Sequence, residues 1–157
     1  MDRIRFIRHR DHRILVYDFN DITDADEVLP HLDRADELVR GEAPGSVLVL
    51  VCVRNLRFNT RSVSRLKVTV ERNRPYVRAS AVVGMSGLHK LVYLGFVRIA
   101  RRDIPAFDDE EAAKDWLVSM AQPDAAPLPD PWRTPRPVPV VPVTSKQTPV
   151  PASPTRR

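Results

Sequence analysis

The chain is poor in cysteine and lacks any long apolar run. Only one of its 157 residues is cysteine, which excludes an intrachain disulfide. No apolar stretch approaches the roughly 20 residues that a membrane-spanning helix needs, so we expect no membrane span. The first residues also lack the apolar segment of a secretory signal peptide, and we therefore expect a cytoplasmic protein.

Sequence motifs of catalysis and metal binding are also missing. The Ser and Asp residues form no nucleophile elbow, Gly-rich phosphate loop or paired-carboxylate motif. The four histidines have no metal-site spacing, and we expect His9 and His12 to be solvated beside a turn. Cys52 lies within an apolar run, where a thiol is buried and inert. We therefore expect no enzyme, no cofactor and no metal.

Proline divides the chain into two parts. Of the 15 prolines, 11 lie between Pro123 and Pro154, in a segment with neither helical nor strand periodicity. Proline removes backbone donors and fixes φ, which favours polyproline II structure or disorder. We therefore predict one α/β domain over residues 1–121 and a disordered Pro-rich tail over residues 122–157.

Strand and helix patterns alternate within the predicted domain. The apolar and β-branched runs that indicate strands are residues 4–7, 14–19, 47–53, 77–83 and 104–107. Helical spacing covers residues 24–41, a segment from residue 59 or 60 to Pro75, residues 87–100 and a segment after the acidic start 108–111. This alternation predicts a mixed sheet of about five strands with about four helices packed on it.

The pattern within each helix predicts its ends and its buried face. Thr23 or Asp24 caps the first helix, with Glu27 in the capping-box position. Asn59 or Thr60 caps the second. We expect the first helix to bury Val28, Leu32, Ala35 and Val39. The second should bury Val63, Leu66 and Val70, and the fourth Ala112, Trp116 and Leu117.

The third helix is apolar almost all round, more than a helix on one side of a sheet requires. The residues expected to face the sheet are Leu88, Leu91, Val92, Gly95 and Ile99. Those left to be covered by something else are Tyr93, Leu94, Phe96 and Val97. A second subunit, a neighbouring helix or an apolar ligand would cover them.

Charge is strongly segregated, although the formal net charge is only +5. Residues 18–42 contain nine acidic residues and two arginines, whereas residues 54–78 contain eight basic residues and one glutamate. Opposed patches suit self-association or a charged protein partner, and a solvated surface is the alternative that we favour. Only Phe58 and Tyr76 lie among the basic residues to stack on bases, so we do not expect nucleic acid as a partner.

Four segments carry a resemblance to a known family: APGSVLVLVCV, RNLRFNTRSVSRLK, NRPYVRASAVVGMSGLHKLVY and FDDEEAAKDWL. Together with the order of elements, they resemble the small bacterial STAS-like (SpoIIAA-like) family, which is related to STAS and SEC14 domains. The resemblance covers about residues 4–120. It implies helices mainly on one side of the sheet and a non-catalytic role in regulation or ligand sensing.

The resemblance also draws attention to the start of the second helix. Anti-sigma antagonists of this fold have a phosphorylatable Ser in an Asp-Ser-Ser-Gly-like turn there, a motif that this chain lacks. A phosphate on Thr60 or Ser62, or an anionic ligand, would meet the helix N-terminus and nearby arginines. Plain capping is the alternative that we favour. The candidate binding residues are Arg54, Arg57, Asn59, Thr60, Arg61 and Ser62.

The sequence thus predicts a regulatory or interaction module that binds a protein partner or forms a homodimer. The alternative is a carrier or sensor of a small apolar or anionic ligand, held between the sheet and the third helix.

Overall fold

A computed structural model describes residues 2–100 and 103–121 of the chain. The strands are β1 (Ile4–His9), β2 (His12–Asp18), β3 (Val47–Cys52), β4 (Val77–Val83) and β5 (Ala106–Phe107). The helices are the 3-10 turn η1 (Ala25–Glu27), α1 (Val28–Arg40), α2 (Thr60–Asn73), α3 (Leu88–Ala100) and α4 (Glu110–Met120). The predicted tail, residues 122–157, lies outside the described residues.

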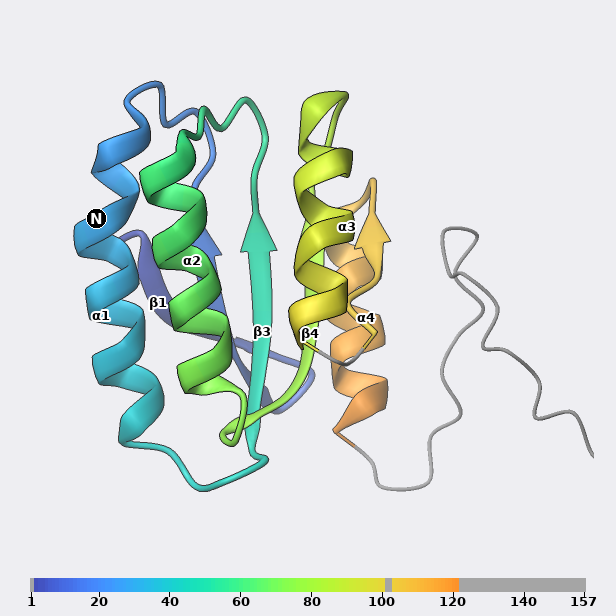
Figure 1. Cartoon of the computed structure of the whole chain (residues 1–157). Coiled ribbons are helices and arrows are strands. Elements are labelled where there is room, and N and C mark those ends of the chain that lie inside the picture. The colour runs from blue at the N-terminus through green and yellow to red at the C-terminus, as the bar shows by residue number, and fades with distance from the viewer. Residues whose placement is uncertain (1, 101–102, 122–157) are drawn as a thin grey trace, which may run out of the picture.

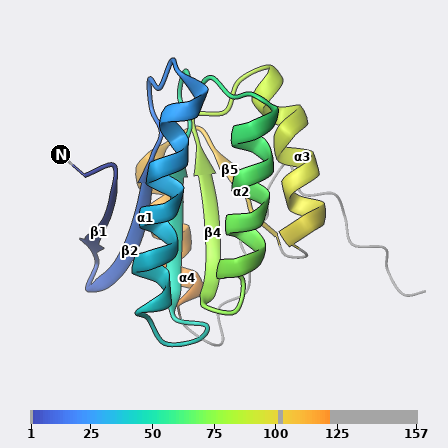
Figure 2. The ribbon, with the colours of Figure 1, turned by 60° about the vertical axis from the view of Figure 1, so that its left-hand side comes forward.

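The strands form one mixed sheet in the order β1-β2-β3-β4-β5. β1 and β2 form an antiparallel hairpin, and the remaining neighbours are parallel. Each parallel connection moves the chain one strand along the sheet, and right-handed crossovers then place successive helices on the same face. Accordingly, α1, α2 and α3 cover one face and α4 covers the other (Figures 1 and 2). The predicted α/β class and the one-sided arrangement of most helices are confirmed.

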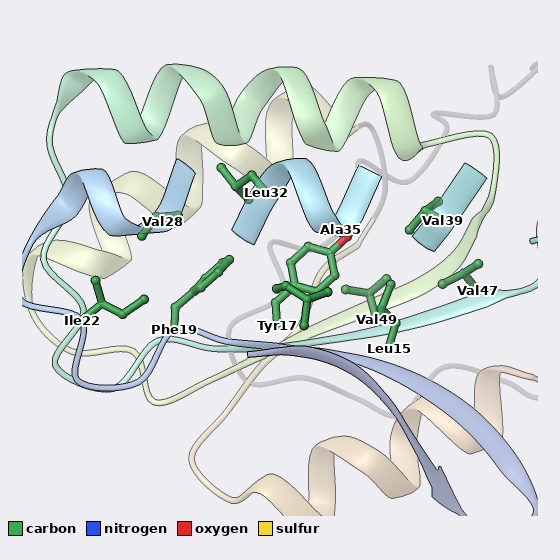
Figure 3. Packing of buried hydrophobic residues seen from close by; sticks show 11 residues of the cluster. Leu15, Tyr17, Phe19, Ile22, Val28, Leu32, Ala35, Val39, Val47 and Val49 are labelled. Carbon is green, nitrogen blue, oxygen red and sulfur yellow. The ribbon is translucent and has the colours of Figure 1, made fainter. Parts of the chain in front are cut away.

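Two apolar cores lie on opposite faces of the sheet, because successive side chains of a strand alternate between faces. Tyr17 and Val49 belong to the core beneath α1, which Figure 3 shows from close by. Leu48 and Leu50 belong to the core beneath α4. The continuous apolar run of β3 is thus explained by burial on both faces.

The start of the first helix differs from the prediction. Asp24 does cap, but its carboxylate accepts the N–H of Asp26 and opens a 3-10 turn. α1 begins only at Val28, and Glu27 makes no side-chain capping bond. The predicted capping box is therefore wrong, because the tighter first turn places the Glu27 N–H on the Asp24 carbonyl. The predicted inward residues of α1 are all buried.

Two corrections concern the C-terminal part of the domain. The strand expected over residues 104–107 is reduced to Ala106–Phe107, since Pro105 has no N–H and contributes only its carbonyl, which accepts from Val82. In α4, Ala113 is buried with Trp116 and Leu117, whereas Ala112 is exposed near the capping Asp109. Among the described residues, no helix has the length and apolar character needed to cross a bilayer.

Candidate functional site

An apolar cavity lies on the helical face of the sheet, between the strands, α2 and α3. In Figure 1 this is the region where β3 is seen between the two helices. Alternate residues of the strands form its floor, and one face of each helix forms a wall. Its apolar lining is Phe19, Val28, Val49, Val51, Val53, Leu56, Phe58, Val63, Leu66, Val70, Val77, Val82, Met85, Val92 and Ile104.

The cavity volume is about 160 Å³, and the cavity is partly open to solvent. Protein interiors contain few voids larger than a water molecule. An engineered cavity of about 150 Å³ lined by Leu, Ile and Phe stays dry and binds benzene. The space between α2 and α3 therefore has the size and lining for a single aromatic ring or a short alkyl chain.

The cavity exists because α3 faces the sheet with a stripe that hydrophobicity alone did not predict. His89, Val92 and Tyr93, which are three and four residues apart, line the cavity. The His89 Nε2 atom is 2.6 Å from the carbonyl oxygen of Leu56, and the Tyr93 hydroxyl donates to the carbonyl of Ile104. These two polar contacts set the rotation of the helix about its axis.

That rotation corrects three predictions for α3. Leu91 and Gly95, expected to face the sheet, are exposed, Leu91 by 67%. Tyr93, expected to point elsewhere, lies in the cavity wall. Leu94 is 55% exposed, and Val97 is half-buried. The predictions for Leu88, Phe96 and Ile99 concern side chains outside those that the structure describes.

A buried polar cluster reaches the cavity wall through Asn73, at the end of α2. Asn73 lines the cavity and is only 2% exposed. Its Nδ2 atom donates to Oδ1 of Asp36 over 2.9 Å. Asp36 is 1% exposed, and its Oδ2 atom accepts from Arg65 and Arg72, each over 2.9 Å. The Asp36 charge is therefore paired and fully hydrogen-bonded, as burial of a carboxylate requires.

Tyr17 lies beside this cluster and also lines the cavity. Burial raises the pKa of the Tyr17 hydroxyl above its ordinary value. A hydrogen bond with the Asn73 side chain acts against this rise, and the Asp36 carboxylate adds to it. The hydroxyl therefore stays protonated and neutral at physiological pH. Sequence reasoning identified neither Tyr17 nor Asn73, although Thr69 and Asn73 are polar residues four apart on the inner face of α2, a signal available in the sequence.

The residues predicted around the start of α2 form a cap. The Asn59 side chain accepts the Ser62 N–H, while the Ser62 hydroxyl accepts the Asn59 N–H. Ser62 is buried, so a kinase would reach its hydroxyl only after this cap opened. Thr60 and Arg57 are exposed. The capping that we favoured from the sequence is present at Asn59 and Ser62.

The acidic and basic segments meet each other instead of forming opposed surface patches. Arg54 pairs with Asp21, Arg61 with Asp26, and Arg65 with Asp33. Hydrogen bonds from Asn55 and Arg54 hold the pKa of the Asp21 carboxyl below its ordinary value. The expected dipolar surface is therefore wrong, because much of its charge is paired within the chain.

Two further reactive side chains, Cys52 and His9, are held within the fold. Burial raises the pKa of the Cys52 thiol to about 12, which keeps it protonated. His9, expected to be solvated, is largely buried instead, and its Nε2 atom lies 2.7 Å from Oδ1 of Asp115 on α4. Within residues 2–100 and 103–121, no group of three or more metal-ligating side chains comes together.

Comparisons of the chain with protein-family models, with curated proteins and with solved structures found no match.

Proposed function

We propose that this chain is a non-catalytic binding module of the STAS-like kind that takes a small apolar molecule into the cavity between the sheet, α2 and α3. The cavity itself carries the proposal: it is a space of about 160 Å³ with an apolar lining. Binding sites for small molecules are concave, mostly apolar and supplied with few polar groups.

An anionic ligand at the start of α2 is less well supported. Arg54 and Arg61 are paired with carboxylates, and the Ser62 N–H is already bound to Asn59. An anion would have to displace these partners. The apolar cavity needs no such rearrangement, and each ligand methylene that enters it contributes roughly 0.8 kcal/mol.

Toluene is a suitable probe because it matches the cavity in size and has no polar group. A ligand that binds only the folded state stabilises it, by about 1.4 kcal/mol at ten times Kd. We expect toluene to raise the thermal unfolding midpoint of the full chain. Replacing Val70 in the cavity wall, Val70→Phe, fills the space and should abolish this increase while the protein stays folded.

The matched control is Val68→Phe, which makes the same substitution on an exposed position of the same helix. It should leave the toluene effect as in the unchanged protein. Absence of any toluene effect in the unchanged protein, or an equal effect in Val70→Phe, would contradict the proposal.

A second candidate function is self-association through α3. Leu91 and Leu94 lie three residues apart on this helix and are both more than half exposed. Val68 on α2 is a further exposed apolar side chain, and α2 and α3 are in contact. A second copy of the chain would bury these side chains, and the oligomeric state in solution tests this candidate.

A further inference from the structure

The Asn73 side chain presents an unused hydrogen-bond acceptor at the cavity wall. Asp36 is fully committed as an acceptor to Arg65 and Arg72, and an ionised carboxylate only accepts hydrogen bonds. The side of the Asn73 amide that faces Asp36 must therefore be the NH₂ group. This fixes the orientation of the amide and turns its Oδ1 atom away from Asp36.

The Oδ1 atom of Asn73 has no hydrogen-bond partner, and of the buried side-chain oxygen and nitrogen atoms in the described part of the chain it alone is in this condition. A buried acceptor without a partner costs free energy, and native proteins rarely leave one. A water or a ligand is one of the ways in which a native protein completes such an atom.

Four other polar side chains of the cavity wall are already engaged. The hydrogen bonds that occupy them are Arg65 to Thr69, Ser62 with Asn59, His89 with Leu56, and Tyr93 to Ile104. What the cavity offers a ligand is thus an apolar space and, at Asn73, a carbonyl oxygen that accepts. The hydroxyls of Tyr17 and Ser80 also line it. A pure hydrocarbon fills the space but leaves the Asn73 oxygen unpaired.

We propose that the cavity selects a small, neutral, mostly apolar molecule with a single hydroxyl group, which donates its hydrogen bond to Oδ1 of Asn73. This rests on the proposed function, because it names the ligand class of the same cavity. Neutrality follows from the apolar lining, where an unpaired charge is costly.

Phenol and toluene form a matched pair of probes, since a hydroxyl in one replaces a methyl in the other. Their dissociation constants are measured by NMR titration of the full chain and of Asn73→Leu, which removes the acceptor but keeps an apolar side chain of similar size. We expect the ratio of the phenol to the toluene dissociation constant to rise about tenfold in Asn73→Leu. Taking the ratio cancels general effects of the substitution on the cavity.

A second measurement in the unchanged protein does not depend on the folding of the variant. Phenol should shift the side-chain amide signals of Asn73 more than toluene does at equal occupancy. Toluene binding with an unchanged ratio and equal amide shifts would overturn the assignment to Asn73 while leaving the proposed function intact. Failure of both probes to bind would overturn the proposed function as well.

Discussion

At the scale of single residues, Asp36 is the charge on which the packing of α1 against α2 depends. It lies on the buried face of α1, where helical spacing alone calls for an apolar side chain. Its carboxylate joins Arg65, Arg72 and Asn73, all from α2. Removing one member of a buried, hydrogen-bonded charge cluster leaves the others without partners, which is costly.

We expect Asp36→Ala to lower the free energy of unfolding by about 3 kcal/mol. Asp33→Ala is the matched control, because Asp33 binds the same Arg65 over 2.6 Å but is exposed. It should cost less than about 1 kcal/mol. Urea denaturation at neutral pH measures both values, and equal losses in the two variants would contradict the role assigned to burial.

The positions of the polar residues in this cluster could be predicted from the sequence, but the pairing of their charges could not. The polar positions Asp36, Thr69 and Asn73 interrupt the apolar faces of their helices, and this interruption is visible in the sequence. Which carboxylate meets which arginine depends on how the two helices are placed side by side. Segregated charge therefore suggested opposed surface patches, whereas the folded chain pairs many of these residues with one another.

At the scale of elements, the sequence predicts the order and type of every regular segment except the η1 turn. The apolar runs of β3 and β4 and the caps of α2 and α4 are strong local signals. The rotation of α3 was not predictable in this way, because a helix that is apolar almost all round has no single preferred face. Polar contacts with residues distant in sequence decide it.

The hydrogen bond of the Tyr93 hydroxyl should therefore help to hold α3 in its position. Tyr93→Phe removes the donor to the buried Ile104 carbonyl, and we expect a loss of about 1 kcal/mol in local stability. Amide hydrogen exchange should become faster in α3 and stay unchanged in β3. Tyr76→Phe, the same substitution in a half-buried tyrosine packed against the core beneath α1, is the control. Equal exchange of α3 in both variants would contradict this anchoring role.

At the scale of the whole molecule, the exposed leucines of α3 bear on assembly. If a second copy covers Leu91 and Leu94, light scattering after size exclusion should show a dimer at micromolar concentrations. Leu94→Asp should convert it to a monomer, because a charge would then be buried in an apolar interface. Leu94→Met keeps the apolar surface and should leave the dimer in place. A monomer in the unchanged protein would exclude self-association by this face.

The void between α2, α3 and the sheet also affects how the folded chain responds to hydrostatic compression. Any part of this space that water does not fill is lost on unfolding, so the unfolded chain with its solvent occupies the smaller volume. High pressure then favours denaturation more than it would in a fully packed domain of this size. A ligand bound in the cavity removes part of that volume difference, so ligand binding would raise the pressure at which the protein unfolds.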